Sequence, residues 1–199
     1  MVEITARGGF DDNLSYLLTA ADGSAAIIDP CAECFKHPAF VMGDKYDFKY
    51  ILLTHGHSDH FDSLAEVKRL LPNVPVCAHR LFEGECDIRF SDGDTLAFGG
   101  DVIEVLFTPG HSRDSLVYIY KPDNALFTGD TLFVDCIGFC RSPRLMADSL
   151  EKLLSLPDEL VVYSGHDYGC VPSRTLAEER INNPEVTPDF LEKLRKSGS

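Results

Sequence analysis

Thr54-His55-Gly56-His57-Ser58-Asp59-His60 directly follows a short apolar run at residues 50–53, which predicts a buried strand. The stretch places three imidazoles and one carboxylate within six residues. In a loop, alternation can turn His55 and His57 to one side while Asp59 and His60 project to another. Because imidazole and carboxylate suit Zn, Fe and Mn, this one segment predicts two adjacent metal sites.

Three other segments have the same form, a predicted strand, then a glycine, then a metal-ligating side chain. They are Gly110-His111, Gly129-Asp130 and Gly165-His166. A glycine suits a tight turn at the end of a strand. Layered α/β proteins build sites from ligands that converge from separate strand ends. We therefore expect these segments to meet the first one, and we expect ordinary surface or core roles for His37 and His79.

The hydrophobic pattern around these segments predicts strands followed by single helices, twice over. Strands are expected at 14–19, 24–28, 50–53, 74–78, 102–107, 116–120, 125–127 and 160–163, and helices at 63–71, 146–154, 175–181 and 190–194. Asp22-Gly23 predicts a hairpin turn between the first two strands. This order favours an α/β protein of packed layers with two similar halves.

Length and charge narrow the class of protein further. A chain of 199 residues is enough for one domain, which we expect to span residues 1–199. The net charge is −14, from 18 Lys and Arg against 32 Asp and Glu, with no basic cluster. Nucleic acid and membrane surfaces are therefore disfavoured as partners. Residues 1–10 carry Glu3 and Arg7 and no apolar run, so we expect no signal peptide and a cytoplasmic protein.

The seven cysteines are Cys31, Cys34, Cys77, Cys86, Cys136, Cys140 and Cys170. An odd number of cysteines indicates reduced thiols. Cys31-x-x-Cys34 invites a redox or zinc interpretation, but a zinc ribbon needs a second such pair. Cys136 and Cys140 have three residues between them instead of two. Small buried or half-buried thiols are the better interpretation.

Together the motifs resemble those of the metallo-β-lactamase-fold hydrolases, and within that family the glyoxalase II-like branch. The matching segments are His55-x-His57-x-Asp59-His60, Thr108-Pro109-Gly110-His111-Ser112, Phe127-Thr128-Gly129-Asp130-Thr131 and Gly165-His166-Asp167-Tyr168, with weaker matches at Asp12-Asn13, Ile28-Asp29-Pro30 and Glu178-Glu179-Arg180-x-x-Asn183-Pro184. They run in the family order from about residue 10 to 185, so the resemblance covers most of the chain.

The resemblance implies a four-layer αββα sandwich with a dinuclear metal site at one edge of its two sheets. By motif position, the first metal ion would be held by His55, His57 and His111, the second by Asp59, His60 and His166, and both by Asp130. The implied cofactors are two divalent metal ions, with Zn favoured and Fe or Mn as alternatives. Two such ions activate a bridging hydroxide and polarise the attacked carbonyl. Catalytic roles are expected for Asp59, which would orient the nucleophile, and for Tyr168, as a hydrogen-bond donor.

One segment departs from the family pattern. The glyoxalase II-like and persulfide dioxygenase-like branches carry a Gly-Arg-x-Asp segment shortly after the bridging aspartate. Here Gly138 and Arg141 lie out of register with that segment, and its acidic residue is missing. Because the segment lies near the substrate in the family, the departure weakens the case for a substrate linked to glutathione.

The sequence thus predicts a metal-dependent hydrolase acting on a small-molecule thioester or ester, such as a hydroxyacyl-thiol. One alternative is a mononuclear iron persulfide dioxygenase, which the segments at 165–168 and 178–184 also resemble. A second alternative is a non-enzymatic, metal-stabilised binding module, which is disfavoured because structural metal sites are closed and rarely dinuclear. The oligomeric state is left open, with a homodimer as one option.

Overall fold

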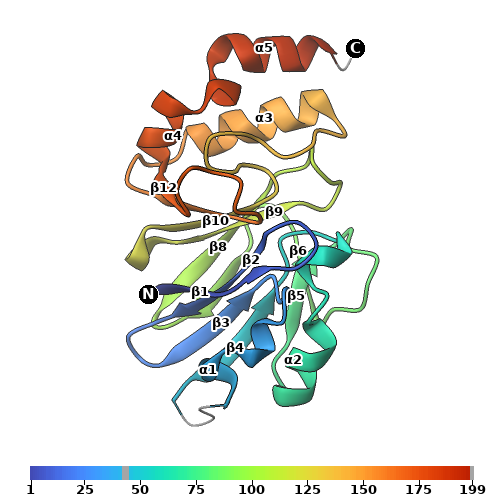
Figure 1. Cartoon of the computed structure of the whole chain (residues 1–199), viewed down its shortest axis with the longest axis vertical. Coiled ribbons are helices and arrows are strands. Elements are labelled where there is room, and N and C mark those ends of the chain that lie inside the picture. The colour runs from blue at the N-terminus through green and yellow to red at the C-terminus, as the bar shows by residue number, and fades with distance from the viewer. Residues whose placement is uncertain (42–44, 198–199) are drawn as a thin grey trace.

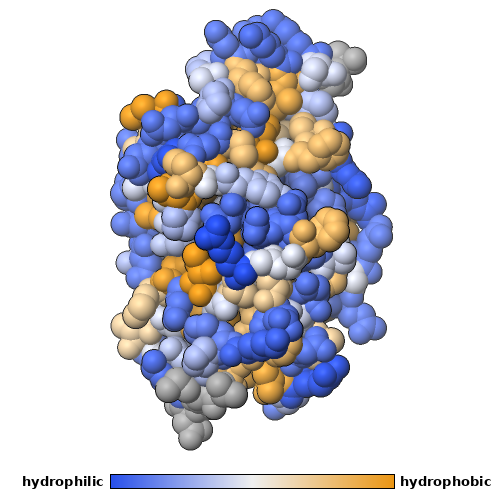
Figure 2. Space-filling model, viewed as in Figure 1, coloured by the Kyte–Doolittle hydropathy of each residue, from blue (hydrophilic) through white to orange (hydrophobic). Residues whose placement is uncertain are grey.

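Figure 1 shows the computed structural model of the chain, which describes residues 1–41 and 45–197. Two six-stranded sheets pack face to face, and helices cover the outer face of each sheet. The layers therefore follow the order αββα, as the sequence predicts. On the face shown in Figure 2, apolar side chains form separate groups among hydrophilic ones.

The first half of the chain builds the first sheet. Its strands, in spatial order, are β1 (Val2–Gly8), β2 (Asn13–Thr19), β3 (Ser24–Ile28), β4 (Asp47–Leu52), β5 (Val76–His79) and β6 (Ile88–Phe90). Strands β1 to β3 are antiparallel, and β3 to β6 run parallel. The predicted turn at Asp22-Gly23 joins β2 to β3, and Gly23 has the positive φ of 90° that such a turn needs.

The second half builds the second sheet. Its strands, in spatial order, are β12 (Arg174–Thr175), β11 (Val161–Ser164), β10 (Ala125–Gly129), β9 (Leu116–Tyr120), β8 (Asp101–Phe107) and β7 (Thr95–Phe98). Only the β10–β11 pair is parallel. Each half of the chain thus supplies one sheet, in agreement with the two halves expected from the sequence.

Helices close both outer faces. On the first sheet lie α1 (Pro38–Val41) and α2 (Leu64–Leu70), and on the second lie α3 (Pro143–Leu154), α4 (Leu176–Asn182) and α5 (Pro188–Ser197). Short 3₁₀ helices are η1 (Cys34–Lys36), η2 (Ser58–His60), η3 (Lys121–Asp123) and η4 (Pro184–Val186). Leu150 and Leu153 of α3 pack on the second sheet, and Val67 of α2 packs on the first. In the part of the chain that the structure describes, no helix is long and apolar enough to cross a bilayer.

Two buried tyrosines connect the sheets across the core. The Tyr16 hydroxyl of the first sheet donates to the Ser164 carbonyl at the end of β11, at 2.6 Å. The Tyr118 hydroxyl of the second sheet donates to the Leu53 carbonyl just after β4, also at 2.6 Å. We call these two hydrogen bonds the tyrosine ties. They hold the ends of β4 and β11 at fixed positions, and the loops that carry five of the seven predicted ligands begin at those ends: His55, His57, Asp59, His60 and His166.

Candidate metal centre

All seven predicted ligands lie at one edge of the two sheets, in two neighbouring groups. The first group is His55, His57, His111 and Asp130, and the second is Asp59, His60 and His166. Within each group the ligand atoms lie within 4.8 Å of one another. The side chains come from the loops after β4, β8, β10 and β11. The structure thus brings together every residue that the sequence marks as a ligand, while metal binding itself stays a prediction.

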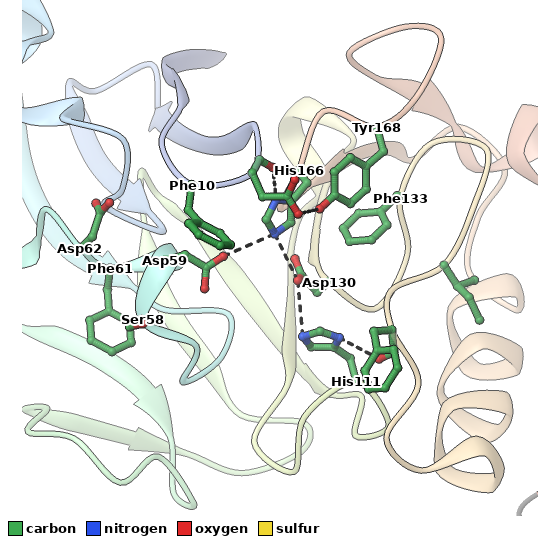
Figure 3. Close-up of a pocket in the computed structure, with 13 residues that line it drawn as sticks. Phe10, Ser58, Asp59, Phe61, Asp62, His111, Asp130, Phe133, His166 and Tyr168 are labelled. Carbon is green, nitrogen blue, oxygen red and sulfur yellow. Dashed lines mark hydrogen bonds and ion pairs between the residues drawn. The ribbon is translucent and has the colours of Figure 1, made fainter.

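Asp130 lies between the two groups, and Figure 3 shows it between His111 of the first group and His166 of the second. Its Oδ2 is 3.4 Å from His111 Nε2 and 3.3 Å from His166 Nε2, while its Oδ1 is 3.3 Å from His60 Nε2. The side chain is buried, and Oδ1 receives no hydrogen bond from the residues that the structure describes. A buried carboxylate oxygen without a donor is costly, and a cation bound there would remove that cost.

Two main-chain carbonyls orient the imidazoles of His111 and His166. His111 Nδ1 donates to the Phe139 carbonyl at 2.9 Å, and His166 Nδ1 donates to the Asp11 carbonyl at 2.6 Å. Because a carbonyl only accepts, these contacts assign the proton of each neutral ring to Nδ1. Nε2 of both rings then faces the cluster with a free lone pair, as in metal sites whose ligands are held by outer hydrogen bonds.

The Asp29 carboxylate orients the imidazole of His60 and, through Thr54, that of His55. Its Oδ2 accepts from His60 Nδ1 at 3.1 Å and from Thr54 Oγ1 at 2.6 Å. Since the Thr54 hydroxyl proton is used in that bond, Thr54 Oγ1 accepts from His55 Nδ1, 3.1 Å away. His55 and His60 therefore also present Nε2 to the cluster. Asp29 is a supporting residue whose only sequence signal is the weak Ile28-Asp29-Pro30 match.

The inward nitrogens lie at hydrogen-bond distance from one another, but neutral rings have too few protons to satisfy all of these contacts. His57 Nδ1 lies 2.9 Å from Nε2 of both His55 and His111, and His60 Nε2 lies 3.2 Å from His166 Nε2. Lone pairs that face one another at these distances repel unless a proton or a metal ion lies between them. The donor set, imidazole nitrogens with carboxylate oxygens, fits divalent Zn, Fe or Mn.

The pKa values of His60 and Asp130 indicate that this part of the cluster attracts positive charge when no metal is bound. Burial alone would lower the pKa of His60, but the carboxylates of Asp130 and Asp29 hold that pKa well above its usual value. Burial alone would raise the pKa of Asp130, but the neighbouring His60 and a hydrogen bond from His166 hold it well below its usual range. The second group therefore takes up protons when no metal is bound, and metal binding would release them. In the first group, burial instead lowers the pKa of His55 and of His111.

The two residues expected to be catalytic lie on the wall of the cavity above the cluster. Asn13 Nδ2 donates to Asp59 Oδ2 at 2.9 Å, which leaves Oδ1 free for another partner. Tyr168 stacks on His166, with ring centroids 5.0 Å apart, and its hydroxyl donates to Asp11. Burial and that hydrogen bond raise the pKa of Tyr168, so the phenol stays protonated. Donation from Tyr168 to a substrate stays a prediction.

The remaining histidines and the cysteines lie outside the cluster. His37 pairs with Glu3 at 3.1 Å, and His79 is buried with its ring stacked on Phe107. All seven cysteines are free, and Cys31 and Cys34 are completely buried. Burial raises the pKa of Cys34 to about 12 and that of Cys31 further, so neither thiol forms a reactive thiolate. The pair packs in the structure as ordinary buried thiols.

The three glycines that precede predicted ligands are needed for different physical reasons. Gly110 and Gly129 have positive φ values of 148° and 49°, as expected for strand-end turns. The predicted turn explanation does not apply to Gly165, because its φ lies outside the left-handed region. A Cβ on Gly165 would lie 2.3 Å from Asp130 Oδ1 and 2.6 Å from His60 Cε1. Gly165 is thus required by the space that the cluster occupies.

The segment that departs from the family pattern is held by the C-terminal part of the chain. Glu179 of α4 accepts from the Asp135 N–H at 3.2 Å, and Glu185 of η4 accepts from the Ile137 N–H at 2.8 Å. Asn183 Nδ2 donates to the Cys136 carbonyl at 3.2 Å. These contacts fix the 135–139 loop, whose Phe139 carbonyl orients His111. In the sequence, Glu179 and Asn183 stand out only as part of a motif match, which indicates no role for them.

We expect Glu185→Ala to weaken metal binding at the His111 group by about 10- to 100-fold, as for other losses of supporting contacts around a metal site. The reason is that the Ile137 N–H loses its acceptor and the Phe139 carbonyl shifts. Glu185→Gln keeps an acceptor oxygen and should bind metal nearly as the parent does. Competition with a chelator measures the affinity. Glu192→Ala, which removes an exposed carboxylate paired with Lys196, is the control. Unchanged affinity in Glu185→Ala would show that the loop is held by other contacts.

Most of the chain is similar in sequence to known proteins. The sequence matches the metallo-beta-lactamase superfamily over residues 8–166. A hydroxyacylglutathione hydrolase of Rhodopseudomonas palustris is 38% identical over 183 residues, which cover 88% of this chain and 71% of that protein. Other hydroxyacylglutathione hydrolases are matched over as little as 63% of their length.

Solved structures agree with the fold. ETHE1 from Myxococcus xanthus superposes with a TM-score of 0.84 and 28% identity, covering all of this chain and 92% of that one. The B3 metallo-beta-lactamase BLEG-1 superposes with a TM-score of 0.81 and 28% identity, covering 94% of this chain and all of that one.

Proposed function

Because this chain belongs to the metallo-beta-lactamase superfamily, we propose that its candidate metal centre hydrolyses a small thioester or ester, as expected of a glyoxalase II-like acyl-thiol hydrolase. The observation that carries the proposal is the position of Asp130 between two groups of inward-facing imidazoles. Hydrolases of hydroxyacylglutathione among its relatives support the thioester as the bond that is cleaved.

In this proposal, the first metal ion is held by His55, His57 and His111, the second by Asp59, His60 and His166, and both by Asp130. Two divalent ions held by these residues would supply a hydroxide nucleophile at neutral pH and would stabilise the charge on the carbonyl oxygen. The Asp59 oxygen that Asn13 leaves free accepts a hydrogen bond from the attacking water and orients it. A C–O bond forms, the C–S bond breaks, and the proton from water ends on the leaving thiolate.

Several finer expectations belong to the same proposal. We propose Zn as the metal, with Fe or Mn as alternatives that the same donor set accepts. Residues 1–199 are proposed to form a single domain in the cytoplasm, where free thiols such as the seven here stay reduced. A small molecule is proposed as the substrate, with no nucleic acid or membrane as a partner.

We expect the protein, purified without added metal, to contain about two divalent ions per chain and to hydrolyse acyl-thioesters. His57→Ala should lose the ion of the first group and lower kcat/KM by more than about 100-fold, because a direct ligand matters more than a supporting contact. Elemental analysis and thiol release measure the two effects. Two bound metals with no hydrolysis of any thioester, ester or lactone would contradict the proposal.

The alternative predicted from residues 165–168 and 178–184 is a mononuclear iron persulfide dioxygenase. The similarity of the fold to that of ETHE1 is compatible with this alternative. The motif that suggested it has another explanation, because Glu179 and Asn183 hold the 135–139 loop. One iron per chain and oxygen consumption with a persulfide would favour the dioxygenase. Metal binding with neither activity would favour the non-enzymatic binding module.

A further inference from the structure

A cavity of about 920 Å³ opens onto the candidate metal centre, and we infer that it binds an uncharged, apolar acyl group. The preferred substrate is then a neutral thioester with a long or aromatic acyl chain, and not an anionic glutathione conjugate. This inference rests on the proposed thioester hydrolysis and adds the chemical class of its substrate. The cavity size is in the range that encloses a ligand of several hundred daltons.

Apolar side chains form most of the cavity wall around the metal ligands. They are Phe10, Phe61, Phe133, Ile137, Phe139 and the ring of Tyr168. Phe133 is buried, and in the view of Figure 3 it lies on the opposite side of His166 from Phe10. Phe10 and Phe139 are 93% and 78% exposed. Two large exposed aromatic side chains beside a cavity are typical of a ligand-binding groove.

The charges on the wall select against anions. Apart from the predicted metal ligands, the charged residues among those that line the cavity are Asp11 and Asp62. No Lys or Arg is found among the described residues that line it. Glutathione carries two carboxylates and one ammonium group. The ammonium can pair with one of these aspartates, but both carboxylates would have to lose water on a wall that offers them no Lys or Arg. The net charge of −14 also disfavours the approach of an anion.

Cationic residues line a different cavity. Arg113 and Arg141 lie on a second cavity of about 320 Å³ on the side of His57, which shares Phe61 with the large one. Arg113 is already paired with Glu83 at 2.8 Å. The larger cavity touches both metal groups, through His111 and His166, and the second cavity touches only His57 among the predicted ligands. A substrate that reaches both metal groups therefore lies mainly in the larger, apolar cavity.

The test compares N-acetylcysteamine thioesters, whose thiol is uncharged, with glutathione thioesters of the same acyl groups, from acetyl to octanoyl. We expect kcat/KM on the neutral series to rise about two- to fourfold for each added methylene. Each glutathione ester should be hydrolysed at least tenfold less efficiently than its neutral counterpart. A flat dependence on chain length, or faster hydrolysis of the glutathione esters, would overturn the inference and leave thioester hydrolysis standing. No hydrolysis in either series would overturn the proposed function as well.

Substitutions of Phe10 and Phe139 test whether the preference for long acyl chains comes from the cavity wall. Phe10→Ala and Phe139→Ala should lower kcat/KM for the octanoyl ester about five- to tenfold more than they lower kcat/KM for the acetyl ester. Ile181→Ala, which removes an equally exposed apolar side chain of α4, should change neither. Binding of octanamide to the metal-free protein, measured by calorimetry, gives a readout without catalysis. We expect it to be at least tenfold tighter than butanamide and to weaken in Phe139→Ala; equal affinities would overturn the inference.

Discussion

Asp130→Ala should lose both metal content and hydrolysis while the protein keeps its fold. The carboxylate lies between both groups, so its removal takes one ligand from each metal and removes the negative charge that lies nearest to His111 and His166. We expect the metal content to fall from about two ions to fewer than one per chain and kcat to fall by more than about 100-fold. Elemental analysis, thiol release and circular dichroism measure the three properties.

The matched comparison for Asp130 is Asp59, which belongs to one group only. Asp59→Ala should empty mainly the second site and keep the first. The fold should survive either change because the three apolar clusters between and outside the sheets do not include these residues. Full metal content and normal turnover in Asp130→Ala would show that Asp130 does not bridge the two groups.

Gly165→Ala should have an effect of similar size although it removes no ligand atom. The added Cβ would lie 2.3 Å from Asp130 Oδ1 and 2.6 Å from His60 Cε1, so at least one of these ligands has to move. A displacement of about 1 Å in such a site costs about 100-fold in rate. We expect kcat to fall by that order and chelators to remove the metal more readily than from the parent protein.

Gly100→Ala is the control for Gly165→Ala, because it strains the backbone without placing an atom near the metal ligands. Gly100 has a φ of 80°, and a Cβ there would meet nothing within 4 Å. This change should cost about 1–2 kcal/mol of stability through strain alone and leave the metal content unchanged. Normal chelator resistance in Gly165→Ala would show that the cluster tolerates the displacement and that the glycine serves another purpose.

The layers of the fold follow from patterns that were visible in the sequence. Buried strands such as β9 and β10 are short runs of apolar residues bounded by Asp, Pro and Gly, and α3 has the spacing of an amphipathic helix. Strands β1, β6, β7 and β12 were not predicted. Residues of β1 are mostly exposed or half-buried because it pairs on one side only. Such a strand carries little of the apolar alternation that prediction depends on.

The seven ligand candidates were predictable because each follows a strand and bears a chemically distinctive side chain. The atoms that orient them were not. The carbonyls of Phe139 and Asp11 hold His111 and His166, and a main-chain carbonyl has no residue-specific signal. Asp29 and Asn13 bear suitable side chains, but only the fold brings Asp29 against His60 and Asn13 against Asp59.

The tyrosine ties have a consequence for how this chain folds. Tyr16 and Ser164 are separated by 148 positions, and Tyr118 and Leu53 by 65. Contacts between such distant positions pay a large loop-closure entropy before they contribute any stability, which slows folding. The loops after β4 and β11 start where these contacts are made, and the two groups of ligands come from both halves of the chain, so the halves must dock before the ligands meet. We therefore expect ligand convergence to be a late event in folding, after the two sheets have packed together.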